Sequence, residues 1–293
     1  MKKKSYLLGL IGSGISASRS PLLHEAEAAH HGIQLVYRLI DLKRLRIETD
    51  DLKHLLQWAE TFGFDGFNVT HPYKATVIPL LHSVSSDANA IDAANTIVLQ
   101  ENRWMGHNTD WSGFAESVRR ELPGVPTGRV AQIGAGGAGA ATAYAMLRMG
   151  AGHVSIHDIN LARATKLASD LQAQFPDRQV SVAAVAKDAL TRADGVILAT
   201  PVGSLNYPGM PFSPELITGN MWVADVIYTP LETPLLRAAR EAGCRTINGS
   251  GMLIYQAAEA FRLFTGLTPD PLRMVRYFES SIESGRRQGH AAA

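Results

Sequence analysis

The sequence has a single cysteine, Cys244, among its 293 residues. One cysteine excludes an internal disulfide, and such low cysteine usage is typical of proteins in a reducing compartment. The apolar run at residues 6–12 is too short, and too closely bounded by glycine, for a signal peptide or a membrane-spanning helix. We therefore expect a cytoplasmic protein with a buried strand near its N-terminus.

An excess of charge of one sign is also lacking. The 28 lysines and arginines nearly balance the 27 aspartates and glutamates, so the formal net charge is +1. Such a chain offers no electrostatic footprint for nucleic acid or for a membrane surface. The ten histidines show no metal-ligand spacing, so we expect no metal site and structural roles for His24 and His71. A small molecule remains as the expected partner.

Strand-like and helix-like patterns alternate along the chain, which predicts an α/β fold with parallel or mostly parallel sheets. At about 150 residues per domain, the length suggests two domains, and a linker at residues 123–128 separates two runs of elements. Ser20 and Pro21 suggest an N-cap and a first-turn proline. We expect strands at residues 7–11, 35–42, 64–67, 94–99, 104–107, 130–133, 154–157, 180–184, 196–199 and 222–225, and helices from Ser20 to near Gly32 and at 52–62, 138–148, 161–175, 252–264 and 271–281.

The stretch at residues 68–74, Asn-Val-Thr-His-Pro-Tyr-Lys, concentrates hydrogen-bonding side chains at the end of an expected strand. Alternation along a strand predicts that Asn68 and Thr70 point the same way, and Pro72 should end the ladder. This pattern suits a polyhydroxylated small molecule. The alternative is an ordinary strand-to-helix turn in which the Asn and Thr side chains only cap.

A glycine-rich loop follows the expected strand at residues 130–133. Gly134, Gly136 and Gly139 form a G-x-G-x-x-G pattern that opens an alanine-rich helix within a βαβ unit of about 30 residues. Such glycines permit a tight turn and let backbone amides approach a pyrophosphate at the helix N-terminus. The alternative is a glycine-rich turn that binds nothing.

Asp158 lies nineteen residues past Gly139, where an acidic side chain would bind the adenosine ribose hydroxyls. A carboxylate there repels a 2′-phosphate, and the next residue is Ile159 rather than arginine, so NAD is favoured over NADP. Arg163, one helical turn onward, leaves NADP open. Asp158 as a helix N-cap is the alternative.

Further polar clusters are not explained by cofactor binding and indicate a second ligand. They lie at residues 16–21, at Asn95 with Thr96, at residues 108–110 and at Gln256. Each has a structural alternative: Ser20 as an N-cap, Ser18 as loop, Asp110 as a first-turn acid favoured by the helix dipole, and Gln256 as a surface residue.

Taken together, these motifs resemble the shikimate dehydrogenase family, including the quinate/shikimate dehydrogenases, over nearly the whole chain. The resemblance implies an N-terminal α/β substrate domain (1–110), a Rossmann-type NAD(P)-binding domain (111–250) and C-terminal helices that pack back on the first domain (251–293). It rests on Ser18-Arg19-Ser20-Pro21, Asn68-Val69-Thr70 with Lys74, Ala94-Asn95-Thr96, Asn108-Thr109-Asp110, the glycine loop, Ala199-Thr200-Pro201-Val202-Gly203, and Gly251-Met252-Leu253 with Gln256.

The same resemblance implies the site. Lys74 and Asp110 would form the catalytic pair, with Asp110 also a substrate ligand, and Tyr228 would lie near the substrate carboxylate. The remaining substrate ligands would be Ser18, Ser20, Asn68, Thr70, Asn95 and Gln256, and the cofactor would be held by Gly134, Gly136, Gly137, Ala138, Gly139, Asp158, Arg163, Thr200, Pro201, Val202, Gly251 and Met252.

The residues also indicate a reaction. Hydride transfer to or from a secondary alcohol needs a group that handles the hydroxyl proton, and a lysine beside a carboxylate can do this. The resemblance narrows this to an expected activity, an NAD-preferring interconversion of shikimate and 3-dehydroshikimate by a monomer or homodimer. Alternatives are a quinate dehydrogenase, a dual quinate/shikimate dehydrogenase, and a non-catalytic ligand sensor, against which the presence of both Lys74 and Asp110 argues.

The chain also departs from common family patterns. It has Gly12-Ser13-Gly14 where Gly-x-Pro is common, and Asp92 where a glycine is common. NADP-dependent members typically carry Asn-Arg-Thr where this chain has Asp158-Ile159-Asn160, which favours the NAD-preferring branch. Ser20 stands where quinate-oxidising members often carry threonine, which favours shikimate.

Overall fold

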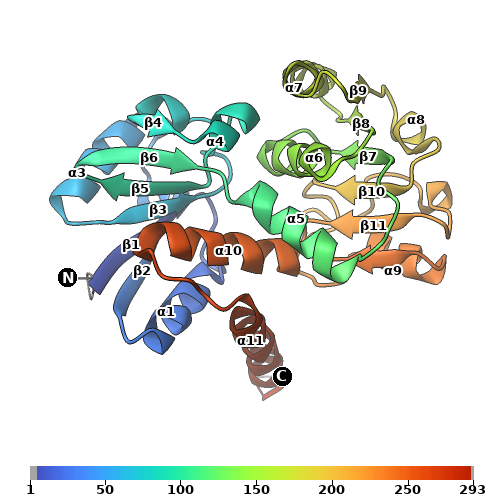
Figure 1. Ribbon diagram of the computed structural model, residues 1–293. Coiled ribbons are helices and arrows are strands. Elements are labelled where there is room, and N and C mark those ends of the chain that lie inside the picture. The colour runs from blue at the N-terminus through green and yellow to red at the C-terminus, as the bar shows by residue number, and fades with distance from the viewer. Residues whose placement is uncertain (1–4, 292–293) are drawn as a thin grey trace. The chain divides into compact units, whose positions relative to one another are not determined.

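The computed structural model describes residues 5–291, with side chains through residue 282. The chain divides into two compact units, one made of residues 1–109 and 254–293 and the other of residues 110–253 (Figure 1). Within the described residues, no helix is long and apolar enough to cross a membrane.

The first unit is built on a mixed six-stranded sheet in the order β2-β1-β3-β5-β6-β4. The pairs β1–β2, β1–β3 and β4–β6 are parallel, whereas β3–β5 and β5–β6 are antiparallel. Glu101 and Asn102, both with positive φ, form the two-residue turn of the β5–β6 hairpin. The strands are β1 (Ser5–Gly12), β2 (Gln34–Asp41), β3 (Gly66–Val69), β4 (Ser83–Val84), β5 (Thr96–Gln100) and β6 (Arg103–His107).

Apolar side chains cover both faces of this sheet. Phe67 and Ile97 pack with Leu52 and Leu56 of α3 on one side. Leu8 packs with Ala260 and Phe264 of α10 on the other. The helices of this unit are α1 (Ser20–His30), α2 (Leu42–Leu45), α3 (Leu52–Thr61), α4 (Ser86–Ile91), α10 (Ser250–Thr265, which crosses the unit boundary) and α11 (Pro271–Ala291), with the short 3₁₀ turns η1 (Thr49–Asp51) and η2 (Ile78–Leu80).

The second unit has a fully parallel sheet in the order β12-β11-β10-β7-β8-β9. Numbered from β7, this is the 3-2-1-4-5-6 order of dinucleotide-binding folds, and it confirms the expected fold class. The strands are β7 (Arg129–Ile133), β8 (His153–His157), β9 (Gln179–Val182), β10 (Gly195–Leu198), β11 (Trp222–Asp225) and β12 (Arg245–Ile247). The helices are α5 (Asp110–Glu121), α6 (Gly137–Met149), α7 (Leu161–Gln174), α8 (Ala186–Leu190) and α9 (Pro234–Glu241), with a 3₁₀ turn η3 (Pro214–Leu216).

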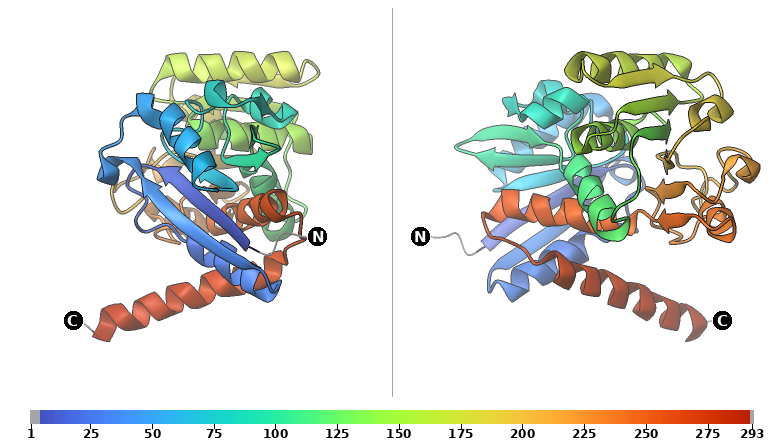
Figure 2. Two further views of the ribbon diagram at one scale, coloured as in Figure 1. Left: turned by 90° about the vertical axis from the view of Figure 1, so that its left-hand side faces the viewer. Right: turned by 45° about the vertical axis from the view of Figure 1, so that its right-hand side comes forward.

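A buried ion pair fastens the C-terminal helix to the first unit. Glu27 of α1 is fully buried, and both its carboxylate oxygens accept hydrogen bonds from the Arg273 guanidinium, at 2.9 and 2.6 Å. The backbone N–H of Asp270 adds a third bond at 2.9 Å. The first turns of α11 consequently lie beside α1 (Figure 2), as expected. The helix is longer than expected, since it runs to Ala291 rather than ending at residue 281.

Replacing Arg273 with methionine should leave the buried Glu27 carboxylate without its guanidinium partner, with the His31 ring, 3.2 Å away, as its remaining side-chain contact. We expect the free energy of unfolding to fall by about 3–5 kcal/mol. A matched control is Arg262→Met, because Arg262 makes the same two-bonded contact with Glu259 on an exposed helix face and should cost no more than about 1 kcal/mol. Urea denaturation of both variants measures the difference, and equal losses would contradict the role given to the buried pair.

Candidate functional site

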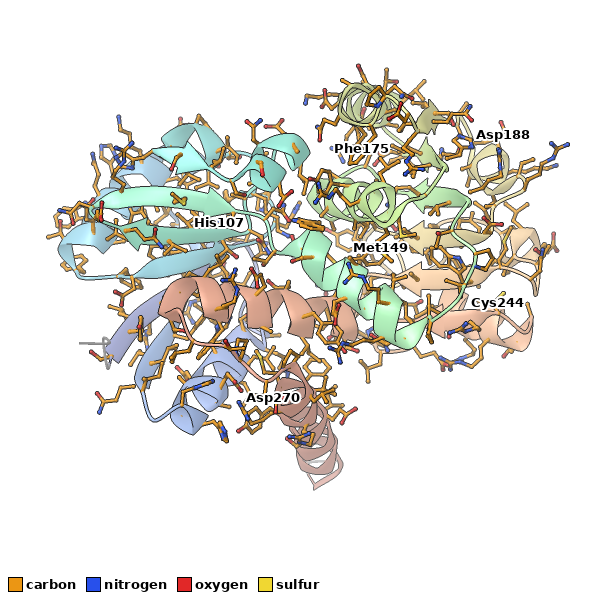
Figure 3. The ribbon with its side chains drawn as sticks, viewed as in Figure 1. His107, Met149, Phe175, Asp188, Cys244 and Asp270 are labelled. Atoms are coloured by element: carbon orange, nitrogen blue, oxygen red, sulfur yellow. The ribbon has the colours of Figure 1, made fainter. Side chains whose placement is uncertain are left out.

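The first unit gathers buried amide and hydroxyl side chains where β3, β5 and β6 meet. Strand pairing sets Asn68 opposite Thr96, and Thr96 opposite His107. The His107 carbonyl, on the residue labelled in Figure 3, accepts a hydrogen bond from the backbone N–H of Asn95 at 3.0 Å. We call Asn68, Asn95, Thr96, Thr109 and Gln256 the amide cluster.

Asn95 is the centre of the amide cluster. Its Oδ1 accepts a hydrogen bond from the backbone N–H of Thr109 at 2.7 Å. Its Nδ2 donates to Thr109 Oγ1 at 2.9 Å and to Gln256 Oε1 at 3.2 Å. Gln256 comes from α10, so a residue far along the chain joins the strand-end residues within the first unit.

Asn68 is held from both ends of its amide. Its Nδ2 donates to the Asn95 carbonyl at 3.2 Å and to Thr96 Oγ1 at 3.0 Å. Its Oδ1 accepts a hydrogen bond from Tyr37 Oη at 2.8 Å. Tyr37, on β2, reaches Asn68 across β1, and sequence reasoning missed it. The only signal was a phenol in an otherwise largely apolar strand, and spacing does not connect that phenol with Asn68.

The first loop joins this cluster through two serines. Ser18 Oγ donates to Ser20 Oγ at 3.2 Å, and the buried Ser20 hydroxyl is hydrogen-bonded to Tyr37. Burial raises the pKa of the Tyr37 phenol, and the hydrogen bond from Ser20 opposes this rise. The expectation that Ser20 is the N-cap is wrong, because Arg19 occupies that position and its side chain makes no cap bond.

Asp41 fixes the backbone of the loop that leads to these serines. Its carboxylate accepts from the N–H groups of Gly14 at 3.0 Å and Ile15 at 3.1 Å. Burial alone would raise the pKa of Asp41, but these bonds and one from the Arg44 N–H hold it below its ordinary value. The loop therefore has a defined path without the proline common in the family.

The stretch at residues 68–74 lies only partly in a strand. Strand β3 ends at Val69, so Thr70 lies just beyond the ladder, and its methyl group packs against Gly12. Within the described residues, the Thr70 hydroxyl makes no hydrogen bond. The half-buried Lys74 follows, and its carbonyl accepts from the Ala94 N–H at 2.9 Å. Lys74 belongs to the first unit, whereas the buried Asp110 is the first residue of α5 in the second.

The glycine loop of the second unit has the geometry that its fingerprint requires. Gly134 has φ +99°, and a Cβ there would lie 2.5 Å from the Ala199 carbonyl oxygen. A Cβ on Gly139 would overlap the Gly134 carbonyl. A Cβ on Gly136 would meet nothing within 4 Å, so protein packing does not require this glycine. In the fingerprint the second glycine lets a pyrophosphate approach the backbone, and the loop therefore fits a dinucleotide.

Asp158 follows β8 and faces this loop. One carboxylate oxygen accepts from the Ala135 N–H and the other from the Asn160 N–H, both at 2.7 Å. The alternative that Asp158 caps α7 is wrong, because Asn160 is the N-cap and accepts from the Arg163 N–H at 3.1 Å. Each carboxylate oxygen keeps a second lone pair, which suits a ribose diol.

The other expected residues of the second unit lie at the carboxyl ends of parallel strands or at the start of α10. Residues 200–202 follow β10, and Tyr228 follows β11. Ligands of open parallel sheets bind at this edge. Gly251 also has a packing role, because a Cβ there would overlap Ser117 and Glu121 of α5.

Two buried titratable groups have shifted pKa values, His24 in the first unit and Asp225 in the second. His24 is fully buried against the Tyr37 ring, with centroids 4.9 Å apart, and burial lowers its pKa to about 3. Its ring is therefore neutral. Asp225, at the end of β11, accepts from the Ile227 N–H at 3.0 Å and from Thr233 Oγ1 at 2.8 Å. Burial raises the pKa of Asp225 to about 6, although both bonds favour the carboxylate.

Comparison with known proteins identifies the chain. Residues 10–97 match the shikimate dehydrogenase substrate binding domain, residues 249–276 the shikimate 5'-dehydrogenase C-terminal domain, and residues 117–223 the alanine dehydrogenase/PNT C-terminal domain. The fold and these matches define an NAD(P)-dependent oxidoreductase.

Relatives that match over nearly the whole chain belong to the same family. A shikimate dehydrogenase (NADP(+)) of Streptomyces avermitilis is 49% identical, with 94% of this chain and 95% of that protein covered. A quinate/shikimate dehydrogenase (NAD(+)) of Corynebacterium efficiens is 45% identical, with 96% and 100% covered. The structure of a quinate dehydrogenase from Corynebacterium glutamicum in complex with NAD is 45% identical, with a TM-score of 0.88 and 94% and 99% covered. The chain belongs to the shikimate dehydrogenase family.

Asp225 gives a pH-dependent stability that can be measured. Its folded pKa lies above the ordinary value of 3.8, so its stabilising effect is complete below about pH 4 and is lost as the pH rises through about 6. Asp225→Asn can keep both contacts but does not ionise. Between pH 4.5 and 7.5, we expect the variant to gain about 2 kcal/mol in unfolding free energy relative to wild type. A difference that stays constant across this range, in urea denaturation, would contradict the assignment.

Proposed function

We propose that the protein is an NAD-preferring dehydrogenase that interconverts shikimate and 3-dehydroshikimate. The amide cluster supports this proposal most directly, because it places amides and hydroxyls on a shared buried framework suited to a ring with several hydroxyl groups. Ser20, rather than threonine, favours shikimate over quinate.

Substrate would be bound through its carboxylate and its ring hydroxyls. Ser18, Ser20 and Tyr228 would hold the carboxylate, and Asn68, Thr70, Asn95 and Gln256 the ring hydroxyls. The Thr70 hydroxyl is suited to this role because its methyl group already packs on Gly12, which fixes the side-chain rotamer.

Lys74 and Asp110 would handle the hydroxyl proton. When bound, the nicotinamide cofactor supplies the hydride acceptor. In oxidation, the lysine side chain takes the proton from the reacting hydroxyl, while the Asp110 carboxylate orients the hydroxyl and favours the charged ammonium. In reduction, the ammonium returns the proton to the carbonyl oxygen.

Cofactor would be held by the glycine loop, by Asp158 and Arg163, by residues 200–202 and by Gly251 and Met252. The Asp158 carboxylate supports NAD, because it is fixed by two backbone N–H groups and a 2′-phosphate would meet its negative charge. Arg163 lies in the first turn of α7, so weaker use of NADP remains part of the proposal.

A second candidate function is oxidation of quinate to 3-dehydroquinate. It is favoured by the similarity to the Corynebacterium glutamicum quinate dehydrogenase bound to NAD. The two candidates share the same residues and differ in the ligand that Ser20 accommodates.

A four-way initial-rate assay tests the proposal, with shikimate or quinate combined with NAD or NADP. We expect the highest kcat/KM for shikimate with NAD. A higher value for quinate would make the second candidate the principal activity, and a higher value with NADP would overturn the role of Asp158. Tight binding of shikimate without any cofactor reduction would indicate a non-catalytic ligand sensor.

Lys74→Ala tests the proton-handling role. Loss of a general acid/base should lower kcat by about 100-fold or more. The matched control is Lys53→Ala, which removes an exposed lysine of α3 and should leave kcat unchanged. Turnover of the Lys74 variant within a few-fold of wild type would rule out the assignment.

A further inference from the structure

Thr109 occupies a special place in the amide cluster. It is the last residue of the first unit before the chain passes to Asp110. Its side chain is buried, and its backbone and hydroxyl both bond to the Asn95 amide. Its hydroxyl also lies 3.3 Å from Gln256 Oε1.

The backbone of Thr109 sets the direction of the Asn95 amide. An N–H group can only donate, so the atom that it meets at 2.7 Å is the Asn95 oxygen. The other end of the Asn95 side chain is therefore the NH₂ group, which donates to Thr109 Oγ1 and Gln256 Oε1. A reversed amide would place two donors against each other at the Thr109 N–H.

The orientation of the Asn95 amide determines the orientation of the Gln256 amide. Because Asn95 Nδ2 donates to it, the nearer end of the Gln256 amide is the oxygen, and its NH₂ group lies on the far side. The single proton of the Thr109 hydroxyl has two acceptors at 3.3 Å, this Gln256 oxygen and Asn95 Oδ1, and a bond to either one is consistent with this arrangement.

The direction of Asn68 is set independently by a second backbone group. The Asn95 carbonyl can only accept, so it fixes Asn68 Nδ2. Both Asn68 protons are thereby used, by the Asn95 carbonyl and Thr96 Oγ1. Asn68 Oδ1 accepts from Tyr37 and retains one lone pair. Asn68 is thus an acceptor toward a ligand.

The same bonds anchor the chain at both crossings between the units. The crossings fall between residues 109 and 110 and between residues 253 and 254. Asn95 binds Thr109, which borders the first, and Gln256, two residues beyond Ile254 at the second. The Asn95 side chain is therefore bonded, within the first unit, to a residue beside each crossing.

We propose that Thr109 is a positioning residue: its backbone N–H sets the direction of the Asn95 amide, and its hydroxyl, bonded to Asn95 Nδ2 and 3.3 Å from Gln256 Oε1, holds both amides in place and fixes the chain immediately before Asp110. Nothing in the proposal requires Thr109 to touch substrate. It rests on the proposed function, and it adds a specificity rule: the substrate donates a hydroxyl proton to Asn68 Oδ1.

Two comparisons between variants isolate the contribution of the Thr109 hydroxyl. Wild type and Thr109→Val differ by a hydroxyl in place of a methyl group, and Thr109→Ser and Thr109→Ala differ by one oxygen. With whichever of shikimate and quinate the wild type uses better, we expect kcat/KM of the Val and Ala variants to fall about 10-fold or more, because both lose the hydrogen bonds of the hydroxyl. The Ser variant should stay within about threefold of wild type.

The controls separate positioning from folding. The dinucleotide Kd without substrate should be unchanged in all variants, because it depends on the glycine loop. Thr265→Val removes a hydroxyl that bonds only within α10 and the residues after it, and it should keep kcat/KM within about twofold. If Thr109→Val does not fold, the Ser and Ala pair still decides the result.

Shikimate analogues with fluorine in place of one ring hydroxyl test the specificity rule in the wild-type protein. Fluorine cannot donate, so one analogue should bind at least about 10-fold more weakly. Equal activity of the Ser and Ala variants, or unchanged kcat/KM in Thr109→Val, would overturn the role of Thr109 while leaving the proposed function intact. A wild-type protein that oxidises neither shikimate nor quinate would overturn both.

Discussion

The hydrogen bond from the Thr109 backbone N–H to Asn95 Oδ1 is the contact on which the first-unit site depends. A side-chain amide has two ends of similar shape, and only a partner that cannot reverse its own role decides between them. The Thr109 N–H sets the orientation of the Asn95 amide, and the Asn95 carbonyl sets the orientation of the Asn68 amide. Buried polar networks of this kind are favourable only when every member is satisfied. The cluster therefore presents one fixed pattern of donors and acceptors instead of several.

The second unit uses backbone geometry for a different purpose. Gly134 and Gly139 are required by protein packing, because a Cβ at either would press on a backbone carbonyl. Gly136 has no such constraint within the protein, which is the expected signature of a residue kept small for a ligand. Asp158 then binds the N–H of Ala135 in the same loop. The loop and the acidic side chain that we propose binds the ribose are thus one hydrogen-bonded assembly.

The sequence predicted the second sheet well because its signals are local. A strand, three glycines and a helix follow one another, and the acid after the next strand lies at the expected spacing. The first unit was harder. The β5–β6 hairpin turns β5 antiparallel to the other five strands, so this sheet is mostly parallel rather than fully parallel. Ser20 looked like an N-cap, yet Arg19 takes that position and the serine hydroxyl joins Tyr37. Tyr37 was missed because its contact with Asn68 depends on strand order across β1, which spacing along the chain does not contain.

Isotope transfer tests the central claim, hydride transfer from a ring alcohol to a nicotinamide, most directly. The substrate would be shikimate with deuterium on the carbon that bears the oxidised hydroxyl, incubated with NAD and the wild-type protein. Direct hydride transfer predicts reduced cofactor carrying one deuterium on the nicotinamide ring, formed in proportion to 3-dehydroshikimate. Product without deuterium in the cofactor, or no reduction of NAD or NADP with either shikimate or quinate, would contradict it.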